Sequence, residues 1–140
     1  MAYWLLKTEP EEFSWDDQVK RGAKGEPWSG VRNFTARGNL KEMKKGDKAF
    51  FYHTGDEKQI VGIAEVIREA YPDPSAKAGE PWVAVTTVAV EPMPKPVTLA
   101  AIKADARFKD MALVKYGRLS VQPVTAKDWQ AVCRMGGLKG

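Results

Sequence analysis

The sequence from residue 60 to residue 68 reads Ile-Val-Gly-Ile-Ala-Glu-Val-Ile-Arg. Its many β-branched residues favour an extended strand, and Gly62 within it indicates a bulge or the close approach of another group. Strand-like segments lie on both sides of it, at residues 48–54 and 82–90, and turn-forming residues separate the three. Three successive β-segments joined by turns predict a meander that curls into a small barrel.

Shorter predicted elements surround this meander. Residues 3–7 are apolar and β-prone, and residues 119–124 form a short strand that Pro123 confines to an edge or an end of a sheet. Helical spacing predicts helices at residues 14–20, 34–44, 98–104 and 107–115, and a last one from Thr125 onwards. No internal repeat or linker interrupts the chain. Residues 1–140 are therefore predicted to form one α+β domain.

Two helix starts carry the spacing of a capping box. Ser14 is followed three residues later by Asp17, and Thr125 by Asp128. In this arrangement the first side chain accepts a hydrogen bond from the backbone at the start of the helix. Asn33 is the expected cap of the helix at 34–44. Apolar residues at helical spacing are predicted to face the core: Phe34, Leu40 and Met43 in that helix, and Trp129, Val132 and Cys133 in the last one.

The composition limits the class of protein. A length of 140 residues with 44% hydrophobic residues suits one domain with its own core. No apolar run approaches the ~18 residues of a membrane span, and the first residues lack the layout of a signal peptide. A single cysteine, Cys133, and a single histidine, His53, leave no internal disulfide and no zinc site of the usual kind. We therefore expect a monomeric, cytoplasmic protein without cofactor, structural metal or membrane partner.

The charge balance favours an anionic partner. The formal net charge is +4 and the isoelectric point is near 9.2, which permits nucleic acid without establishing it. Few acidic residues interrupt a basic run on and beside the helix at 34–44, formed by Arg37, Lys41, Lys44 and Lys45. These side chains are candidates for contacts with a phosphate backbone, and the alternative is an ordinary solvated helix face.

The segment Trp28-Ser29-Gly30-Val31-Arg32-Asn33-Phe34 is the first candidate for a binding site. Turn-forming residues precede it, so Trp28 is expected on a loop. A flat indole beside a guanidinium and a carboxamide suits the stacking of a base and the reading of its edge. The alternative is that Trp28 covers the core and Arg32 caps a carbonyl. Replacement of Trp28 by Ala distinguishes the two interpretations, because it would greatly lower the stability of the protein only if Trp28 covers the core.

Other candidate ligand contacts lie at strand ends. Alternation along Phe50-Phe51-Tyr52-His53-Thr54 places Phe51 and His53 on one side and Tyr52 on the other. Tyr52 and His53 have hydrogen-bonding groups for a ligand, although a lone histidine also commonly binds the backbone. Further candidates are Ser120, Gln122 and Lys7, each of which is also an ordinary polar residue on a strand edge or end. A glutamine side chain can hydrogen-bond to a donor and an acceptor of one base at the same time, as in the recognition of adenine.

Motifs of known enzyme classes are missing from the sequence. There is no phosphate-binding loop, no Gly-x-Gly-x-x-Gly and no His-Glu-x-x-His. A hydrolase acting on RNA or a nucleobase remains an alternative, with Lys7, Glu9, Tyr52 or His53 transferring protons. A module that binds a peptide from another protein is the second alternative.

Several motifs, in the same order, resemble the EVE domain family. The match is carried by Tyr3-Trp4-Leu5-Leu6-Lys7-Thr8-Glu9-Pro10, Trp28-Ser29-Gly30-Val31-Arg32-Asn33-Phe34 with Ala36-Arg37, Phe51-Tyr52-His53, Val61-Gly62-Ile63-Ala64-Glu65-Val66, Tyr71-Pro72-Asp73-Pro74 and Leu119-Ser120-Val121-Gln122-Pro123-Val124. These motifs cover nearly the whole chain, and together they are far more specific than any single one. The chain is similar to stand-alone bacterial members of this family.

The resemblance implies a PUA-like fold, a curled β-barrel of about five to six strands flanked by helices. It also implies a binding module for a modified nucleobase, such as a methylated or hydroxymethylated cytosine, in DNA or RNA. The matching positions then become candidates for an aromatic pocket: Trp28, Arg32, Asn33, Tyr52, His53, Ser120, Gln122 and Lys7. No basic extension accompanies the matching segment, unlike in nuclear members of the family, and this again favours the cytoplasm.

Overall fold

A computed structural model describes residues 1–139, which form six strands and five α-helices. The strands are β1 (Tyr3–Thr8), β2 (Glu26–Pro27), β3 (Lys48–His53), β4 (Gln59–Pro72), β5 (Val83–Thr98) and β6 (Val121–Val124). The α-helices are α1 (Trp15–Lys20), α2 (Phe34–Glu42), α3 (Leu99–Lys103), α4 (Ala112–Lys115) and α5 (Ala126–Met135). Short 3₁₀ turns at Gly22–Lys24 and Ala106–Phe108 complete the list.

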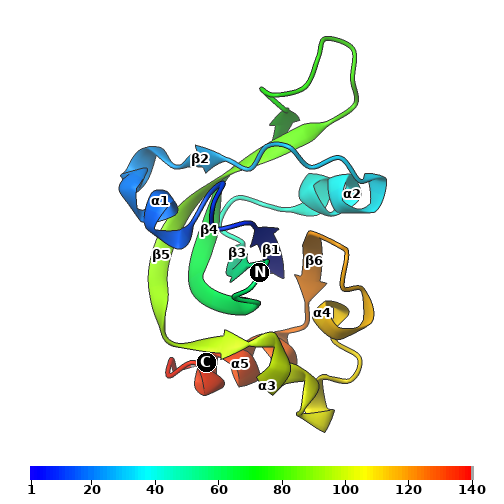
Figure 1. Cartoon of the computed structure of the whole chain (residues 1–140). Coiled ribbons are helices and arrows are strands. Elements are labelled where there is room, and N and C mark those ends of the chain that lie inside the picture. Colours follow the sequence, from blue (N-terminus) through cyan, green and yellow to red (C-terminus); the bar gives the residue numbers. More distant parts are fainter. Residues whose placement is uncertain (140) are drawn as a thin grey trace.

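The six strands form one mixed sheet in the order β2-β5-β4-β3-β1-β6. The sheet curls strongly, and the long strand β5 bends around one side of the molecule (Figure 1). All neighbouring strands are antiparallel except β1 and β3, which run parallel. Parallel neighbours need a long crossover, and residues 9–47 supply it. This crossover contains α1, β2 and α2, together with the segment that begins at Trp28. The predicted fold class, a curled α+β barrel, is confirmed.

The core is divided between the two faces of the sheet. Leu5, Phe50 and Tyr52 belong to one apolar cluster, which α3, α4 and α5 cover. Leu6 and Phe51 belong to the other cluster, which α1, α2 and the Trp28 segment cover. Because side chains alternate along a strand, neighbouring residues of β1 and β3 necessarily enter different clusters. The predicted alternation along β3 is therefore confirmed.

Gly62 lies at an irregularity of the sheet. In the pairing of β3 with β4, Phe51 faces Gly62 and Tyr52 faces Ile60, so Val61 is the extra residue of a bulge. A Cβ atom at Gly62 would lie 2.6 Å from the ring of Trp15. The glycine therefore allows the first residue of α1 to pack directly on the sheet backbone. Both alternatives predicted for this position, a bulge and a close approach, are present.

The helix starts follow their predicted capping signals. The Ser14 hydroxyl accepts a hydrogen bond from the backbone of Asp17, and the Asp17 carboxylate accepts one from the backbone of Ser14. Asn33 at α2 and Thr125 at α5 each accept a backbone N–H with the side chain, without the reciprocal hydrogen bond seen at Ser14. These side chains satisfy N–H groups that have no partner within their helix.

Two sequence-based expectations about the helices were wrong. Phe34 is 64% exposed, whereas Leu40 and Met43 are fully buried as predicted. As the first residue of α2, Phe34 lies beyond the part of the helix that the sheet covers, and its ring instead contacts Trp82. The predicted helix at 107–115 is divided into a 3₁₀ turn and the short helix α4. The predicted stripe of α5 is confirmed, since Trp129, Val132 and Cys133 are all buried.

Candidate functional site

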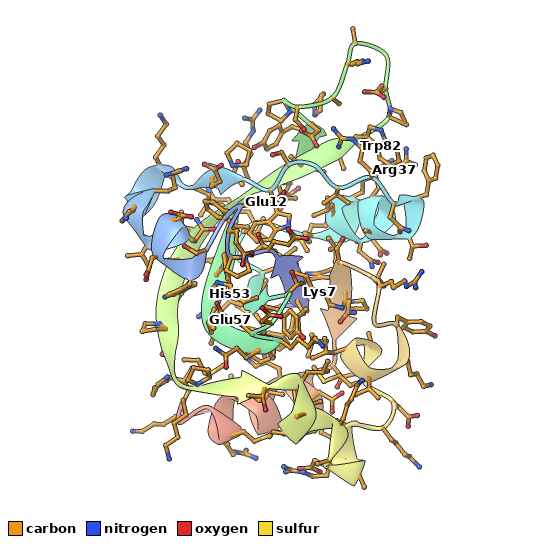
Figure 2. All side chains as sticks on the ribbon, in the orientation of Figure 1. Lys7, Glu12, Arg37, His53, Glu57 and Trp82 are labelled. Atoms are coloured by element: carbon orange, nitrogen blue, oxygen red, sulfur yellow. The ribbon has the colours of Figure 1, made fainter. Side chains whose placement is uncertain are left out.

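A cavity of about 680 Å³ opens where the end of β1 meets the start of β6 and the Trp28 segment. Lys7 and Glu12 border it from β1 and from the loop that follows (Figure 2). The backbone N–H of Lys7 donates to the carbonyl of Ser120, over 2.9 Å, and thereby joins the two strand ends. The volume of the cavity lies in the range of pockets that bind small ligands.

Trp28 forms the apolar wall of this cavity together with Phe13, Pro27 and Val31. Its indole meets Phe13 and Phe51 edge-to-face, with ring centroids 6.1 and 5.4 Å apart. The Trp28 backbone N–H donates to the carbonyl of Val85, over 2.7 Å. Only 6% of Trp28 is exposed. The residue therefore serves the core and the cavity at once, and replacement by Ala is now expected to lower stability as well as binding.

The buried carboxylate of Asp73 holds the Trp28 segment in place. It accepts hydrogen bonds from the backbone N–H of Gly30, over 2.8 Å, and from the Arg32 guanidinium, over 3.0 Å. The backbone and hydroxyl of Ser75 donate to its other oxygen. Burial acts to raise the pKa of Asp73, but the hydrogen bonds from Ser75, Gly30 and Arg32 outweigh it and hold the pKa below its ordinary value. Arg32 also donates to the carbonyl of Val31, so it caps a carbonyl as the alternative interpretation expected.

Several polar side chains of the cavity are available to a ligand. Among residues 1–139, no hydrogen bond or ion pair within the protein occupies the side chains of Glu9, Glu12, Ser29, Arg118 or Ser120. They provide carboxylate acceptors, hydroxyl groups and one free guanidinium around the apolar wall. A flat ligand against Trp28 would therefore meet both donors and acceptors at its edges.

Lys7 also lines the cavity, but its ammonium group is already engaged. It donates to the carbonyl of Gly117, over 2.7 Å, and lies 5.6 Å from the centre of the Tyr52 ring. Partial burial lowers the pKa of Lys7. The hydrogen bond to Gly117 fixes the position of the ammonium group at the strand end.

Four of the predicted contacts lie outside this cavity. Tyr52 is 3% exposed and packs in the cluster on the opposite face of the sheet, where burial raises the pKa of its hydroxyl. Asn33 uses its side-chain oxygen to cap α2. Gln122 is fully buried and donates to the carbonyls of Tyr116 and Leu119. Trp28, Arg32, Ser120 and Lys7 are the candidates that the fold brings together.

His53, the fourth of these residues, joins α1 to the sheet. Its Nε2 accepts a hydrogen bond from the backbone N–H of Trp15, over 3.0 Å, and its Nδ1 lies 2.9 Å from a carboxylate oxygen of Glu57. This arrangement assigns the proton to Nδ1. The hydrogen bond to His53 lowers the pKa of Glu57. Both ring nitrogens thus have partners within the protein, and the pair lies together in Figure 2.

The predicted phosphate contacts do not line the main cavity. Lys41, Lys44 and Lys45 are exposed at the far end of α2, and Arg37 contacts the ring of Phe34. A second cavity of about 510 Å³ lies beside the start of α2. Its lining includes Asn33 and Tyr116, and it shares Arg118 with the main cavity.

Four residues of the site were not predicted from the sequence: Glu12, Phe13, Asp73 and Arg118. Asp73 lies in the quoted motif Tyr71-Pro72-Asp73-Pro74, which was the available signal for it. Glu12, Phe13 and Arg118 occupy irregular segments, where no periodicity indicates which way a side chain points. Only the pairing of β1 with β6 brings these segments together.

Neither a cluster of metal-ligating side chains nor a membrane-spanning helix occurs within residues 1–139. No group of three or more His, Cys, Asp or Glu side chains is arranged there to hold a metal ion. No helix in the same range has the length and apolar character needed to cross a membrane.

The curled sheet with flanking helices defines a PUA-like domain. The same fold occurs in the YTH domain of Zygosaccharomyces rouxii MRB1, with a TM-score of 0.61 over 96% of this chain and 86% of that chain, at 16% identity. A match to the EVE domain family model covers residues 2–135. The chain therefore belongs to the EVE domain family, and the resemblance noted in the sequence is confirmed.

More similar proteins share both sequence and structure with this chain. The NMR structure of Rpa0253 from Rhodopseudomonas palustris has 58% identity and a TM-score of 0.92, covering 98% of this chain and 94% of that chain. Human thymocyte nuclear protein 1 is 33% identical over 94% of this chain and 72% of its own length. The structure of human THYN1 in complex with 5-methylcytosine containing DNA has 32% identity and a TM-score of 0.89, covering all of both chains.

Proposed function

We propose that this protein is a binding module that holds a modified cytosine of DNA in the cavity beside Trp28. The observation that carries the proposal is an aromatic wall bordered by unpaired polar side chains, in a cavity of about 680 Å³. The crystal structure of human THYN1 with 5-methylcytosine containing DNA supports the choice of base, because its fold and sequence are similar over the whole chain.

Stacking on Trp28 provides the first part of the binding energy. Base–aromatic stacking contributes about 1–3 kcal/mol per base, and taking a base out of a duplex costs a few kcal/mol. One stacked base alone is therefore a weak ligand. Burial of a methyl group against Phe13 or Pro27 adds only about 0.8 kcal/mol, so preference for a methylated base also needs a cavity of matching shape.

The free carboxylates suit the amino group of cytosine. The N4 amino group is a donor, and Glu or Asp is its natural acceptor. Glu12 and Glu9 line the cavity on its solvent side. Arg118 and Ser120 are then the available donors for the carbonyl oxygen of the base. Lys7 and Arg118 place positive charge near the flanking phosphates, which offsets repulsion from the carboxylates.

The rest of the proposal concerns the protein as a whole. We propose that it acts as a monomer in the cytoplasm and that residues 1–140 form the single binding unit. Arg37, Lys41, Lys44 and Lys45 stay proposed contacts with the nucleic-acid backbone. The alternative hydrolase would need proton transfer among Lys7, Glu9, Tyr52 and His53, and only the first two line the cavity.

Titration of the tryptophan fluorescence with short single-stranded oligomers tests the proposal. Each oligomer carries one cytosine, 5-methylcytosine or thymine at its centre, and a matching RNA set is added. Thymine has the same C5 methyl group as 5-methylcytosine but presents O4, an acceptor, in place of the N4 amino donor. We expect the tightest binding for 5-methylcytosine, with affinity that falls as salt rises. Absence of binding to every oligomer would refute the proposed function.

Glu12→Gln has a matched control at the neighbouring position. Glu12 lines the cavity, whereas Glu11 is exposed outside it. A bidentate or charged contact to a base edge contributes about 1–3 kcal/mol of discrimination. Glu12→Gln is therefore expected to reduce the preference for 5-methylcytosine over thymine by about 5- to 150-fold, and Glu11→Gln to leave it unchanged. Equal effects of the two variants would exclude a role for Glu12 in reading the base.

A further inference from the structure

Two aromatic side chains with an arginine at each end form a row that begins at the edge of the cavity, between α2 and the start of β5. The Arg32 guanidinium lies 5.6 Å from the centre of the Trp82 ring, and the Trp82 ring lies 5.0 Å from that of Phe34. The Arg37 guanidinium lies 5.3 Å from the centre of the Phe34 ring. Trp82 and Arg37 lie close together beside α2 (Figure 2). We call these four residues the aromatic–arginine ladder.

The ladder has both an exposed apolar surface and an unbalanced positive charge. Phe34 is 64% exposed, which a contribution to the core does not explain. Arg37 has no carboxylate partner among the described residues, and its only side-chain hydrogen bond there goes to the carbonyl of Pro81, over 3.3 Å. Arg32 is neutralised by Asp73. An exposed ring next to a guanidinium without a carboxylate partner among the described residues suits a stacked base with its phosphate.

The ladder is continuous with the main cavity. Arg32 lines that cavity and also lies over Trp82. Asp73, whose side chain is fully buried, fixes the position of the Arg32 guanidinium. A strand that leaves the cavity on this side therefore meets Trp82 and Phe34 next. An acidic protein would interact with the positive charge, but its binding would not require an aromatic surface that continues from the cavity.

We propose that the aromatic–arginine ladder binds the nucleotide flanking the recognised base, with its base against Phe34 and its phosphate at Arg37. The proposal rests on the function proposed above and names the route of the strand outside the cavity. A base on Phe34 is a sequence-tolerant contact, because every base has a flat face. The ladder thus adds affinity without adding specificity for the nucleotide sequence.

Two oligomers distinguish this route from other effects. Both contain five nucleotides, one with 5-methylcytosine at the 5′ end and one with it at the 3′ end, so that the flank runs in opposite directions. We expect Phe34→Ala to weaken binding of one oligomer by about fivefold or more and to leave the other unchanged. Arg37→Gln should lower the salt dependence for that same oligomer by about 0.7 in the slope of log K against log salt.

Tyr116→Ala is the matched control. Tyr116 is 59% exposed and lines the second cavity, which also adjoins the main one. Loss confined to Tyr116→Ala would mean that the strand leaves by the second cavity, and would overturn the proposal while the proposed function stands. No loss in Phe34→Ala, or an equal loss for both oligomers, would also overturn it. If the unmodified protein binds neither oligomer, the proposed function fails together with this inference.

Discussion

Helices alone cover one face of the sheet, whereas the irregular Trp28 segment covers the other face together with α1 and α2. On the helix-covered face, under α3, α4 and α5, the ring of Trp129 stacks on Phe50 with centroids 3.9 Å apart and on Tyr3 with centroids 4.5 Å apart. On the cavity face, Trp28 and Trp15 meet Phe51 edge-to-face, at 5.4 and 5.3 Å. The helix-covered face is therefore a closed stack, whereas on the cavity face Trp28, although 6% exposed, also lines the cavity.

The difference follows from the backbone above each face. A helix presents a regular apolar stripe that fits a sheet without gaps, as α5 does with Trp129 and Val132. The Trp28 segment is an irregular part of the crossover between two parallel strands, and its backbone is held by Asp73 and Val85. An irregular cover leaves a cavity, and polar groups from the same loop surround it. In this protein the candidate binding site therefore lies where a loop covers the core.

Replacement of Trp129 by Ala tests the helix-covered face and has the largest expected effect. Removing a buried tryptophan typically costs about 3–5 kcal/mol of unfolding free energy, and Trp129 is 5% exposed between two rings. Chemical denaturation measures the loss. The folded fraction should still bind oligomers with unchanged affinity, whereas Trp28→Ala should lose both stability and binding. Loss of affinity in folded Trp129→Ala would show that the two faces are coupled.

Replacement of Asp73 by Asn tests the anchor of the cavity face. Hydrogen bonds to a charged group contribute about 1.5–3 kcal/mol, and Asp73 receives them from Gly30, Arg32 and Ser75. We expect a loss of about 1.5–3 kcal/mol near neutral pH, together with weaker oligomer binding. Asp105→Asn is the matched control, because Asp105 pairs with Arg107 at the surface away from the cavity.

The sign of the pH dependence sharpens this test. The pKa of Asp73 is lower in the folded protein than its ordinary value of 3.8. A carboxylate of this kind stabilises the folded state above its unfolded pKa, and the stabilisation disappears as pH falls through the folded pKa. The difference in unfolding free energy between the natural protein and Asp73→Asn should therefore be constant above about pH 5 and shrink below about pH 4. A difference that grows on acidification would contradict the assignment.

Replacement of His53 by Ala has the smallest expected effect of the three. It leaves the buried backbone N–H of Trp15 without an acceptor, which costs about 1–3 kcal/mol. Oligomer binding should stay within twofold of the natural protein, because His53 does not line the cavity. Glu57→Gln removes only the charge next to His53, so it should lower the unfolding free energy by less than His53→Ala does. Loss of binding without loss of stability would restore His53 as a ligand contact.

Parts of the fold and of the cavity were predictable from short patterns. Alternation placed Phe51 and His53 on one side of β3 and Tyr52 on the other, and polar spacing identified Ser14 and Asn33 as helix caps. The parallel pairing of β1 with β3 was not predictable, because no local pattern encodes which strands become neighbours. Phe34 was misplaced for a related reason, since helical spacing does not say where the sheet beneath a helix ends.

The sequence by itself determined the family, most of the elements and the presence of an aromatic residue in the Trp28 segment, because these depend on local residue order. The tertiary structure alone decided which side chains share the cavity. It brought Lys7, Ser120 and Arg32 to the wall of Trp28 and added Glu12 and Arg118, while Tyr52, Gln122 and His53 were placed elsewhere. The physical reason is that a cavity is formed by chain segments distant in sequence, whose approach depends on strand pairing and on the buried contacts of residues such as Asp73.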